Sequence, residues 1–169
     1  MKESSIKKIV ETAKELLLVK TVSEISMNAI ADRLNLTAPT LYYYFTGKDE
    51  LLSAAGVVLA TEMEAPLKIK FPKSIKSDIR LMTVGHMVID TMIKKNIPGS
   101  YLIADPSDKP IRLGNFRSEF INLCRKVFND EGKKGYQLLA LLTVEIDMHQ
   151  RTASAIPEDV IADFIKLLK

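Results

Sequence analysis

Hydroxyl-bearing and aromatic side chains gather in one short stretch of the chain, residues 26–48. Three consecutive tyrosines, Tyr42–Tyr44, follow Thr37 and Thr40, and Lys48 comes four residues after the last tyrosine. Tyrosine and threonine hydroxyls and a lysine amine can bind phosphate oxygens, while rings and methyl groups can contact thymine methyls. This set therefore predicts contact with the backbone and base edges of DNA.

The sequence contains no comparable set for catalysis. It has no phosphate-binding loop, no nucleophile elbow and no supported pair of carboxylates. Its two histidines, His86 and His149, and its one cysteine, Cys124, do not have the spacing of metal ligands. We therefore expect a protein that is not an enzyme and that holds no metal or cofactor.

Composition is that of a globular protein with its own core: the 169 residues are 47% hydrophobic and 27% charged. The chain has no apolar run near the roughly 20 residues of a membrane span, and its charged N-terminus is unlike a signal peptide. With one cysteine and no membrane segment, we expect a cytoplasmic protein. The net charge is +3, but residues 1–61 carry seven Lys or Arg and seven Asp or Glu. The DNA prediction therefore depends on local geometry and not on a basic field.

Helical patterns would position the hydroxyl-rich stretch. An apolar stripe at three- and four-residue spacing predicts a first helix of about four turns that ends near residues 19–20. Ser26 is a good N-cap for a second helix, since its hydroxyl can accept from a free backbone N–H. Asn35 stands where the following turn needs a left-handed residue, and Leu36 is expected to enter the core. The stripe of the first helix is Ile6, Ile9, Val10, Ala13, Leu16 and Leu17, and the second helix is expected to bury Ile30, Ala31 and Leu34.

A third short helix follows the turn, with Thr37 as its expected N-cap and Pro39 in its first turn. Leu41 and Phe45 are four residues apart, so both can face the core. That choice turns Pro39, Thr40, Tyr43 and Tyr44 outward. Thr46 and Asp49 have the spacing of a capping box, so a fourth helix is expected to start there with N–H groups that suit a phosphate.

The order Ile-Ala, a turn, Thr-Leu-Tyr-x-x-Phe and then Lys-Asp-Glu-Leu-Leu resembles the DNA-binding domain of the TetR family of transcriptional repressors, over residues 4–55. The resemblance implies an all-α protein of about nine helices. Residues 1–50 would be a three-helix DNA-binding domain with a helix-turn-helix, and residues 51–169 a helical ligand-binding and dimerisation domain. It also implies a homodimer on a palindromic operator of double-stranded DNA, released by a small-molecule ligand.

The resemblance assigns roles to single positions. Tyr42 and Lys48 would contact phosphates, Thr40 would meet a phosphate or a base edge, and Ser26 would start the second helix beside the backbone. The residues that read bases would be Ala38, Pro39, Tyr43 and Tyr44. The full expected DNA-binding set is Ser26, Asn28, Thr37, Ala38, Pro39, Thr40, Tyr42, Tyr43, Tyr44 and Lys48.

Some positions depart from the family pattern. Thr21-Val22 stands where the family usually has Gly-Tyr or Gly-Phe, and Asn35 where it usually has Gly. The third helix carries no Arg, Lys, Gln or Asn, so bidentate recognition of guanine or adenine is poorly supplied. We predict weak direct readout, with preference coming from Thr and Tyr contacts and from DNA shape.

The sequence after the DNA-binding region, about two thirds of the chain, predicts further helices and a ligand cavity. Between residues 75 and 93, apolar residues recur at spacings of four and three, which predicts a helix with one buried stripe. Asp90 lies four residues after His86 and could hydrogen-bond to its imidazole. His86 can be a core histidine or a polar group in a ligand cavity, and both interpretations stay open. The stripe is Ile75, Ile79, Met82, His86, Ile89 and Ile93, and the expected ligand-binding residues are Met82, His86, Tyr101 and Phe120. They suit an apolar effector with one polar end.

Other segments of this region carry weaker predictions. A lysine-rich run, residues 68–80, is either a solvated face or an approach to flanking phosphates. Residues 96–115 would hold one short helix at 101–104 between loops, and residues 116–127 would form a helix with Cys124 in the core.

The apolar surface of the last two expected helices predicts that the protein dimerises. Residues 138–144 are apolar nearly all round, and residues 156–168 give the closing helix a wide apolar face. One subunit of this size cannot hide both, whereas a two-fold four-helix bundle would. Glu145 and His149 are four residues apart and are expected to share a hydrogen bond.

The leading hypothesis is thus a ligand-released repressor. The alternative is a constitutive or architectural DNA-binding protein without an inducer, because 169 residues are few for the family and leave room for only a small cavity.

Overall fold

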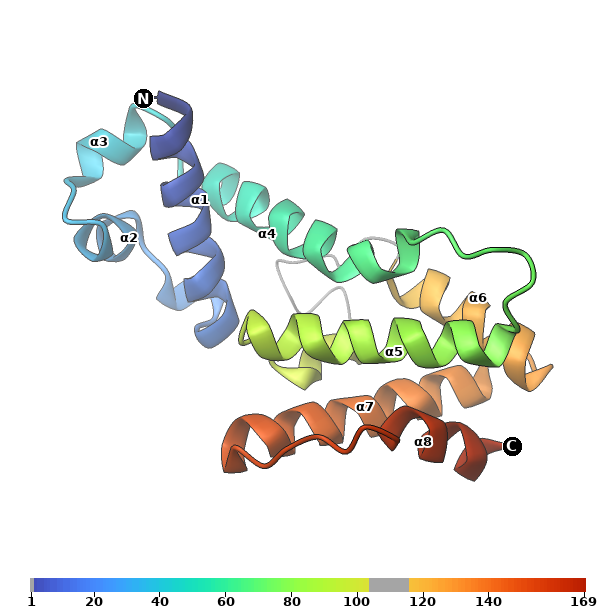
Figure 1. Cartoon of the computed structure of the whole chain (residues 1–169). Helices are drawn as coiled ribbons and strands as arrows, with labels where there is room; N and C mark the ends of the chain where they lie inside the picture. The colour runs from blue at the N-terminus through green and yellow to red at the C-terminus, as the bar shows by residue number, and fades with distance from the viewer. Residues whose placement is uncertain (1, 104–115) are drawn as a thin grey trace. The chain divides into compact units, whose positions relative to one another are not determined.

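The computed structural model describes residues 2–103 and 116–169, and these are helical with no strand (Figure 1). The described chain forms two compact units that part between Thr61 and Glu62. The all-α prediction is confirmed. None of the described helices is both long and apolar enough to cross a membrane.

The first unit contains α1 (Lys2–Val19), the short 3-10 helix η1 (Val22–Glu24), α2 (Met27–Arg33), α3 (Ala38–Tyr42) and most of α4 (Lys48–Glu64). The second contains the end of α4, then η2 (Ala65–Lys68), α5 (Ser77–Lys94), η3 (Gly99–Leu102), α6 (Phe116–Phe128), α7 (Lys133–Thr152) and α8 (Val160–Leu168).

The stripe predicted on α1 is buried from Ile9 to Leu17, and the helix ends at Val19 as expected. Two details were wrong. Ile6 is 37% exposed, and Lys14, expected off the stripe, is only 2% exposed. The Lys14 amine forms an ion pair with Glu11, which compensates the burial of its charge.

The turn between α2 and α3 is a Schellman motif. The Leu36 N–H donates to the Ala31 carbonyl at 2.9 Å and the Asn35 N–H to the Asp32 carbonyl at 3.1 Å. Asn35 has φ = 53°, the left-handed conformation that the sequence predicted. Leu36 was expected in the core but is 38% exposed, because the motif carries it past the end of α2 rather than between the helices. Leu34, expected to be buried, is half-buried.

The face that α5 buries differs from the predicted stripe, of which only Ile89, at 2% exposed, is buried as expected. Ile75 and Ile79 are exposed by 37% and 44%, and Met82, His86 and Ile93 are half-buried. The residues that are at most 1% exposed are Leu81, Val84, Val88 and Met92. Gly85 explains the choice: a Cβ there would lie 3.1 Å from the Ile161 side chain, so the glycine side is where α8 packs. Asp90 was expected to hold His86, but its carboxylate lies 3.6 Å from the Lys94 amine instead.

The segment after α5 is anchored on α7 by polar contacts. The Gly99 N–H donates to Asp147 Oδ1 at 2.7 Å, and the Thr143 hydroxyl donates to the Gly99 carbonyl at 3.2 Å. A Cβ on Gly99 would meet the Thr143 carbonyl at 2.4 Å, so only glycine allows this close approach. The short helix predicted at 101–104 is η3, which ends at Leu102, and residues 104–115 lie outside the described residues.

Helices α5 to α8 enclose the core of the second unit. Phe116 and Phe120 on α6 are fully buried, with their rings 5.9 Å apart. Cys124 is buried beside them on α6 as predicted, and burial, together with nearby Asp130, raises its thiol pKa to about 12. The expected hydrogen bond between Glu145 and His149 is replaced, since His149 Nδ1 contacts the Ser154 carbonyl where the chain leaves α7.

Candidate nucleic-acid interface

α3 and the residues that follow it bury one side and expose two tyrosines. Leu41 and Phe45 are 0% and 7% exposed, whereas Tyr42 and Tyr43 are 55% and 69% exposed. Tyr44 is half-buried, and its ring meets Tyr43 edge to face at 5.0 Å between centroids. The inward placement of Leu41 and Phe45 and the outward placement of Pro39 and Tyr43 are confirmed, whereas Thr40 and Tyr44, also expected outside, are half-buried. Tyr42, the last residue of α3, and Tyr43, its C-cap, are thus two large amphipathic side chains at the surface.

Two hydroxyls stand together at the start of the same helix. Thr37 occupies the N-cap position, but its side chain does not cap a backbone N–H. Instead the Thr37 and Thr40 hydroxyl oxygens lie 2.9 Å apart. In such a pair one hydroxyl donates to the other, so the accepting hydroxyl keeps its own proton for a further acceptor. Pro39 is exposed beside them and Ala38 is half-buried.

α2 presents two more residues of the expected set. Ser26 is the N-cap, as predicted, and its hydroxyl oxygen accepts from the Ala29 N–H at 3.1 Å. Accepting uses a lone pair, so the Ser26 proton can still go to a phosphate oxygen. Asn28, in the first turn of α2, is exposed.

Lys48 begins α4 and ties it to the turn after α1. Its amine donates to the Val22 carbonyl at 3.1 Å, and the side chain is half-buried. An ammonium has three donors, so this bond fixes the amine while leaving two donors for phosphate oxygens. Val22 belongs to η1, the segment that departs from the family pattern, and this 3-10 turn is held by Glu24, which accepts from the Thr21 N–H and hydroxyl at 2.8 Å each.

The cap of α4 differs from the predicted one. The sequence predicted a capping box between Thr46 and Asp49. In the structure Glu50 Oε2 accepts instead, from the Thr46 N–H at 2.6 Å and from the Thr46 hydroxyl at 2.7 Å. A residue four positions on reaches back because α4 starts only at Lys48. These two bonds lower the pKa of Glu50 below its usual value of 4.5, the hydroxyl contributing most.

We expect Glu50→Gln to lower the thermal unfolding midpoint at neutral pH. Because the folded-state pKa of Glu50 is depressed, its stabilisation is present above the unfolded pKa and is lost as pH falls through the folded pKa. The difference from wild type should therefore shrink as the pH drops below 4.5. Circular dichroism melts from about pH 7 to about pH 3 measure it, with exposed Glu15→Gln on α1 as the control. A difference that stays constant over this range would show that Glu50 does not act through its charge.

None of the four predicted ligand-binding residues lines the pocket found among the described residues of the second unit. Tyr101 and Phe120 are 2% and 0% exposed, and burial raises the pKa of the Tyr101 phenol. Met82 and His86 lie on the half-buried side of α5. A pocket of the second unit is lined by other residues, and the role of these four as ligand contacts stays a prediction.

Sequence reasoning missed Glu24 and Glu50, which hold the turns on either side of the helix-turn-helix. The signal for Glu24 was present, since Thr21 and Glu24 have capping-box spacing. It also missed the pocket, whose residues come from three separate segments.

Residues 9–55 match the family described as bacterial regulatory proteins, tetR family. The fold is similar to that of a tetR-family transcriptional regulator from Streptomyces coelicolor, with TM-score 0.70, 14% identity and coverage of 98% of this chain and 79% of that one.

Two further structures have a similar fold. AmtR of Mycobacterium smegmatis has TM-score 0.66 and 19% identity, over 95% of this chain and 84% of that one. PfmR, a TetR-family transcriptional regulator from Thermus thermophilus, has TM-score 0.65 and 18% identity, over 95% of this chain and 96% of that one. No curated protein matches the chain. Residues 9–55 thus match the tetR family of bacterial regulatory proteins, and the chain has the fold of TetR-family transcriptional regulators.

Proposed function

We propose that this protein is a transcriptional repressor that binds a palindromic operator as a homodimer and leaves it when a small molecule binds. The observation that carries the proposal is the exposed pair Tyr42 and Tyr43 at the C-terminal end of α3, within a matched helix-turn-helix domain. In such domains the second short helix enters the major groove and neighbouring groups hold the phosphates. Such a regulator would work in the cytoplasm, where bacterial DNA lies.

The proposed contacts follow from the side chains that α2, α3 and α4 present. Tyr42 and Lys48 hold phosphates, with the hydroxyls of Ser26 and Thr40 as further backbone contacts. Tyr43, Tyr44, Pro39 and Ala38 meet base edges, while Asn28 and Thr37 lie at the margin. The residue list of this surface is Ser26, Asn28, Thr37, Ala38, Pro39, Thr40, Tyr42, Tyr43, Tyr44 and Lys48.

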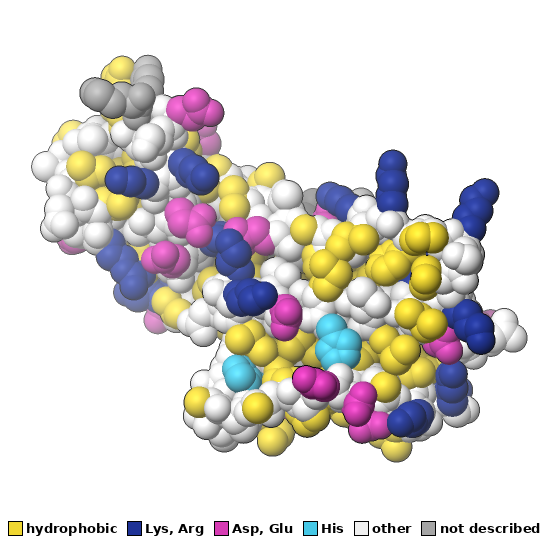
Figure 2. All heavy atoms as spheres, in the orientation of Figure 1, with side chains coloured by type: hydrophobic (Ala, Val, Ile, Leu, Met, Phe, Trp, Pro, Cys, Tyr) yellow, Lys and Arg dark blue, Asp and Glu magenta, His cyan; other side chains and the backbone are white. Residues whose placement is uncertain are grey.

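An apolar stripe on α7 supports the homodimer. Residues four apart on this helix are exposed, and three of them are large: Tyr136 at 56%, Val144 at 56% and Met148 at 52%. Leu167 on the neighbouring α8 is 73% exposed. Figure 2 shows hydrophobic side chains on the surface of the second unit over these helices. We propose that α7 and α8 pack against their copies in a partner, which would cover this surface with an isologous four-helix contact.

Release by a ligand would follow from linkage. A ligand that binds better to dimers whose two α3 helices are wrongly spaced lowers DNA affinity by its differential affinity for that state. DNase footprinting on the DNA next to the protein's own coding sequence, with and without candidate effectors, tests the proposal. Protection that an effector removes supports it. Protection insensitive to every effector favours the alternative, a constitutive or architectural DNA-binding protein.

The absence of long polar or basic side chains on α3 leads to a prediction about specificity. We expect the affinity ratio between the operator and a scrambled duplex to fall at or below about 10³, the low end for specific regulators. Anisotropy titrations at one fixed salt concentration measure both affinities. A ratio above about 10⁵ would mean that bases are read by contacts that α3 does not supply.

A further inference from the structure

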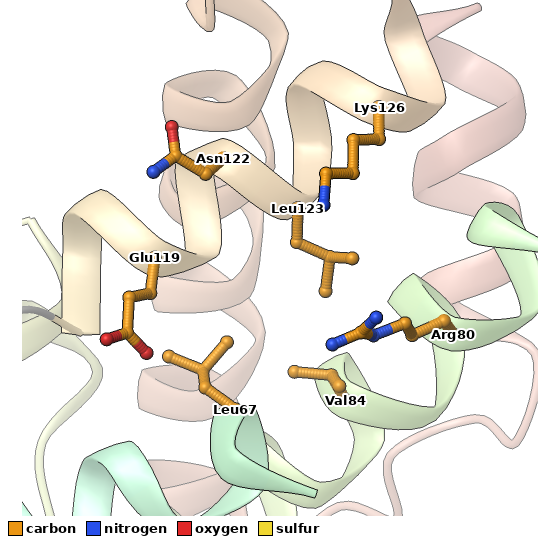
Figure 3. Close-up of a pocket in the computed structure, with 7 residues that line it drawn as sticks. All are labelled: Leu67, Arg80, Val84, Glu119, Asn122, Leu123 and Lys126. Atoms are coloured by element: carbon orange, nitrogen blue, oxygen red, sulfur yellow. The ribbon is translucent and has the colours of Figure 1, made fainter. Parts of the chain in front are cut away.

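The second unit contains a pocket between η2, α5 and α6 (Figure 3). Its volume is about 200 Å³. One face of α6 supplies four of its residues, at positions i, i+3, i+4 and i+7, and α5 supplies two that are one turn apart. The lining is Leu67, Arg80, Val84, Glu119, Asn122, Leu123 and Lys126.

Arg80 carries a donor for which the described chain has no acceptor. Its Nε is buried, and no residue in 2–103 or 116–169 accepts a hydrogen bond from it. The guanidinium carbon lies 5.3 Å from the centre of the Phe71 ring, which holds the group in place by a cation–π contact. Because Nε is closed off, a ligand in the pocket would meet the end of the guanidinium, which Figure 3 shows facing the space between Val84 and Leu123.

The charges around the pocket favour an anion. Arg80 and Lys126 contribute two positive charges and Glu119 one negative charge, which leaves one positive charge uncompensated in the lining. Figure 3 shows Arg80 reaching toward the space between Val84 and Leu123, while Glu119 lies across the pocket beside Leu67. A carboxylate near Arg80 would therefore be separated from the one like charge, and a guanidinium fork suits a carboxylate.

The rest of the lining suits a small apolar body. Leu67, Val84 and Leu123 come from three different segments and meet around the pocket. An apolar cavity of about 150 Å³ is known to hold benzene. This pocket of about 200 Å³ is bordered by the exposed side chains of Glu119, Asn122 and Lys126, and it has room for a ring or a branched chain of similar size together with a carboxylate.

We propose that this pocket binds a small monocarboxylate with an apolar body, about the size of benzoate, with its carboxylate on the Arg80 guanidinium. The binding stands on the pocket alone. Its effect on DNA, by contrast, rests on the proposed ligand-released repressor, so binding and release are measured separately.

Calorimetric titration of the full chain with sodium benzoate, in the absence of DNA, tests the site. Benzyl alcohol and benzylamine have the same ring without the negative charge, and we expect each to bind at least tenfold more weakly than benzoate. Arg80→Met keeps the side-chain stem over Phe71 and should weaken benzoate at least tenfold. Glu119→Gln, which removes the like charge, should bind benzoate at least as tightly as wild type, and exposed Arg151→Met on α7 should not change it.

Equal binding of benzoate and benzyl alcohol by the wild-type protein would overturn the proposal, and so would the absence of benzoate binding. This comparison needs no variant, so it decides the matter even if Arg80→Met fails to fold. Wild-type protein that binds DNA but not benzoate refutes the pocket proposal alone. Protein that binds benzoate but no DNA refutes the repressor and leaves the pocket intact.

Discussion

Met148→Glu is expected to make the protein monomeric at micromolar concentration and to weaken operator binding at least a hundredfold. Met148 is 52% exposed on α7, in the apolar stripe that we assign to the partner contact. In a two-fold interface each substitution appears twice, so two carboxylates would be buried in the contact. Burying unpaired charges costs several kcal/mol of association free energy, which is enough to separate a dimer with an interface of ordinary size at micromolar concentration.

The loss of DNA binding follows from the loss of the second half-site. A monomer engages one recognition helix, and a hundredfold loss corresponds to about 2.7 kcal/mol. Sedimentation and anisotropy titration measure the two effects. Ile79→Glu is the matched control, because it places the same charge on a 44% exposed isoleucine of α5 in the same unit. If the Met148→Glu protein stays dimeric, this face of α7 is not part of the dimer interface.

Tyr42→Asp is expected to abolish measurable binding to the operator, with a loss of at least a hundredfold, while the fold is retained. The Tyr42 side chain is 55% exposed, so the substitution creates no cavity. It removes a hydroxyl proposed to donate to a phosphate and places a carboxylate near that phosphate. Tyr42→Phe removes only the hydroxyl and should cost about tenfold, or ~1.4 kcal/mol.

Val19→Asp is the matched control for this substitution. Val19 is 65% exposed at the end of α1 in the same unit, so it changes the net charge of the DNA-binding unit equally. Anisotropy titrations of the variants against one labelled duplex give the comparison. If Val19→Asp weakens binding as much as Tyr42→Asp does, the effect belongs to overall charge and Tyr42 is not at the interface.

The helix-turn-helix was predictable because its signals are local. An N-cap at Ser26, a left-handed Asn35 and the pair Leu41 and Phe45 each depend on residues within a few positions, and the structure confirms all of them. The acid predicted to cap α4 was wrong by one residue. Asp49 and Glu50 are both acids in the first turn, and which of them reaches Thr46 depends on where the helix actually starts.

The second unit was less predictable because its outcome depends on packing between distant segments. α5 has apolar residues on more than one side. The side that is buried is the one against which α8 packs, at Gly85. Spacing along one helix cannot show that choice. The pocket at Arg80 is of the same kind, since Leu67, Arg80 and Leu123 are brought together only by the fold.

The central claim is that two copies of α3 bind two operator half-sites as one dimer, and half-site spacing tests it most directly. Once the operator is footprinted, about five base pairs are inserted at its centre, which rotates one half-site by about half a turn of DNA. We expect the affinity measured by anisotropy to fall at least a hundredfold, and an insertion of about ten base pairs, a full turn, to restore part of it. Affinity unchanged by the half-turn insertion would contradict the account.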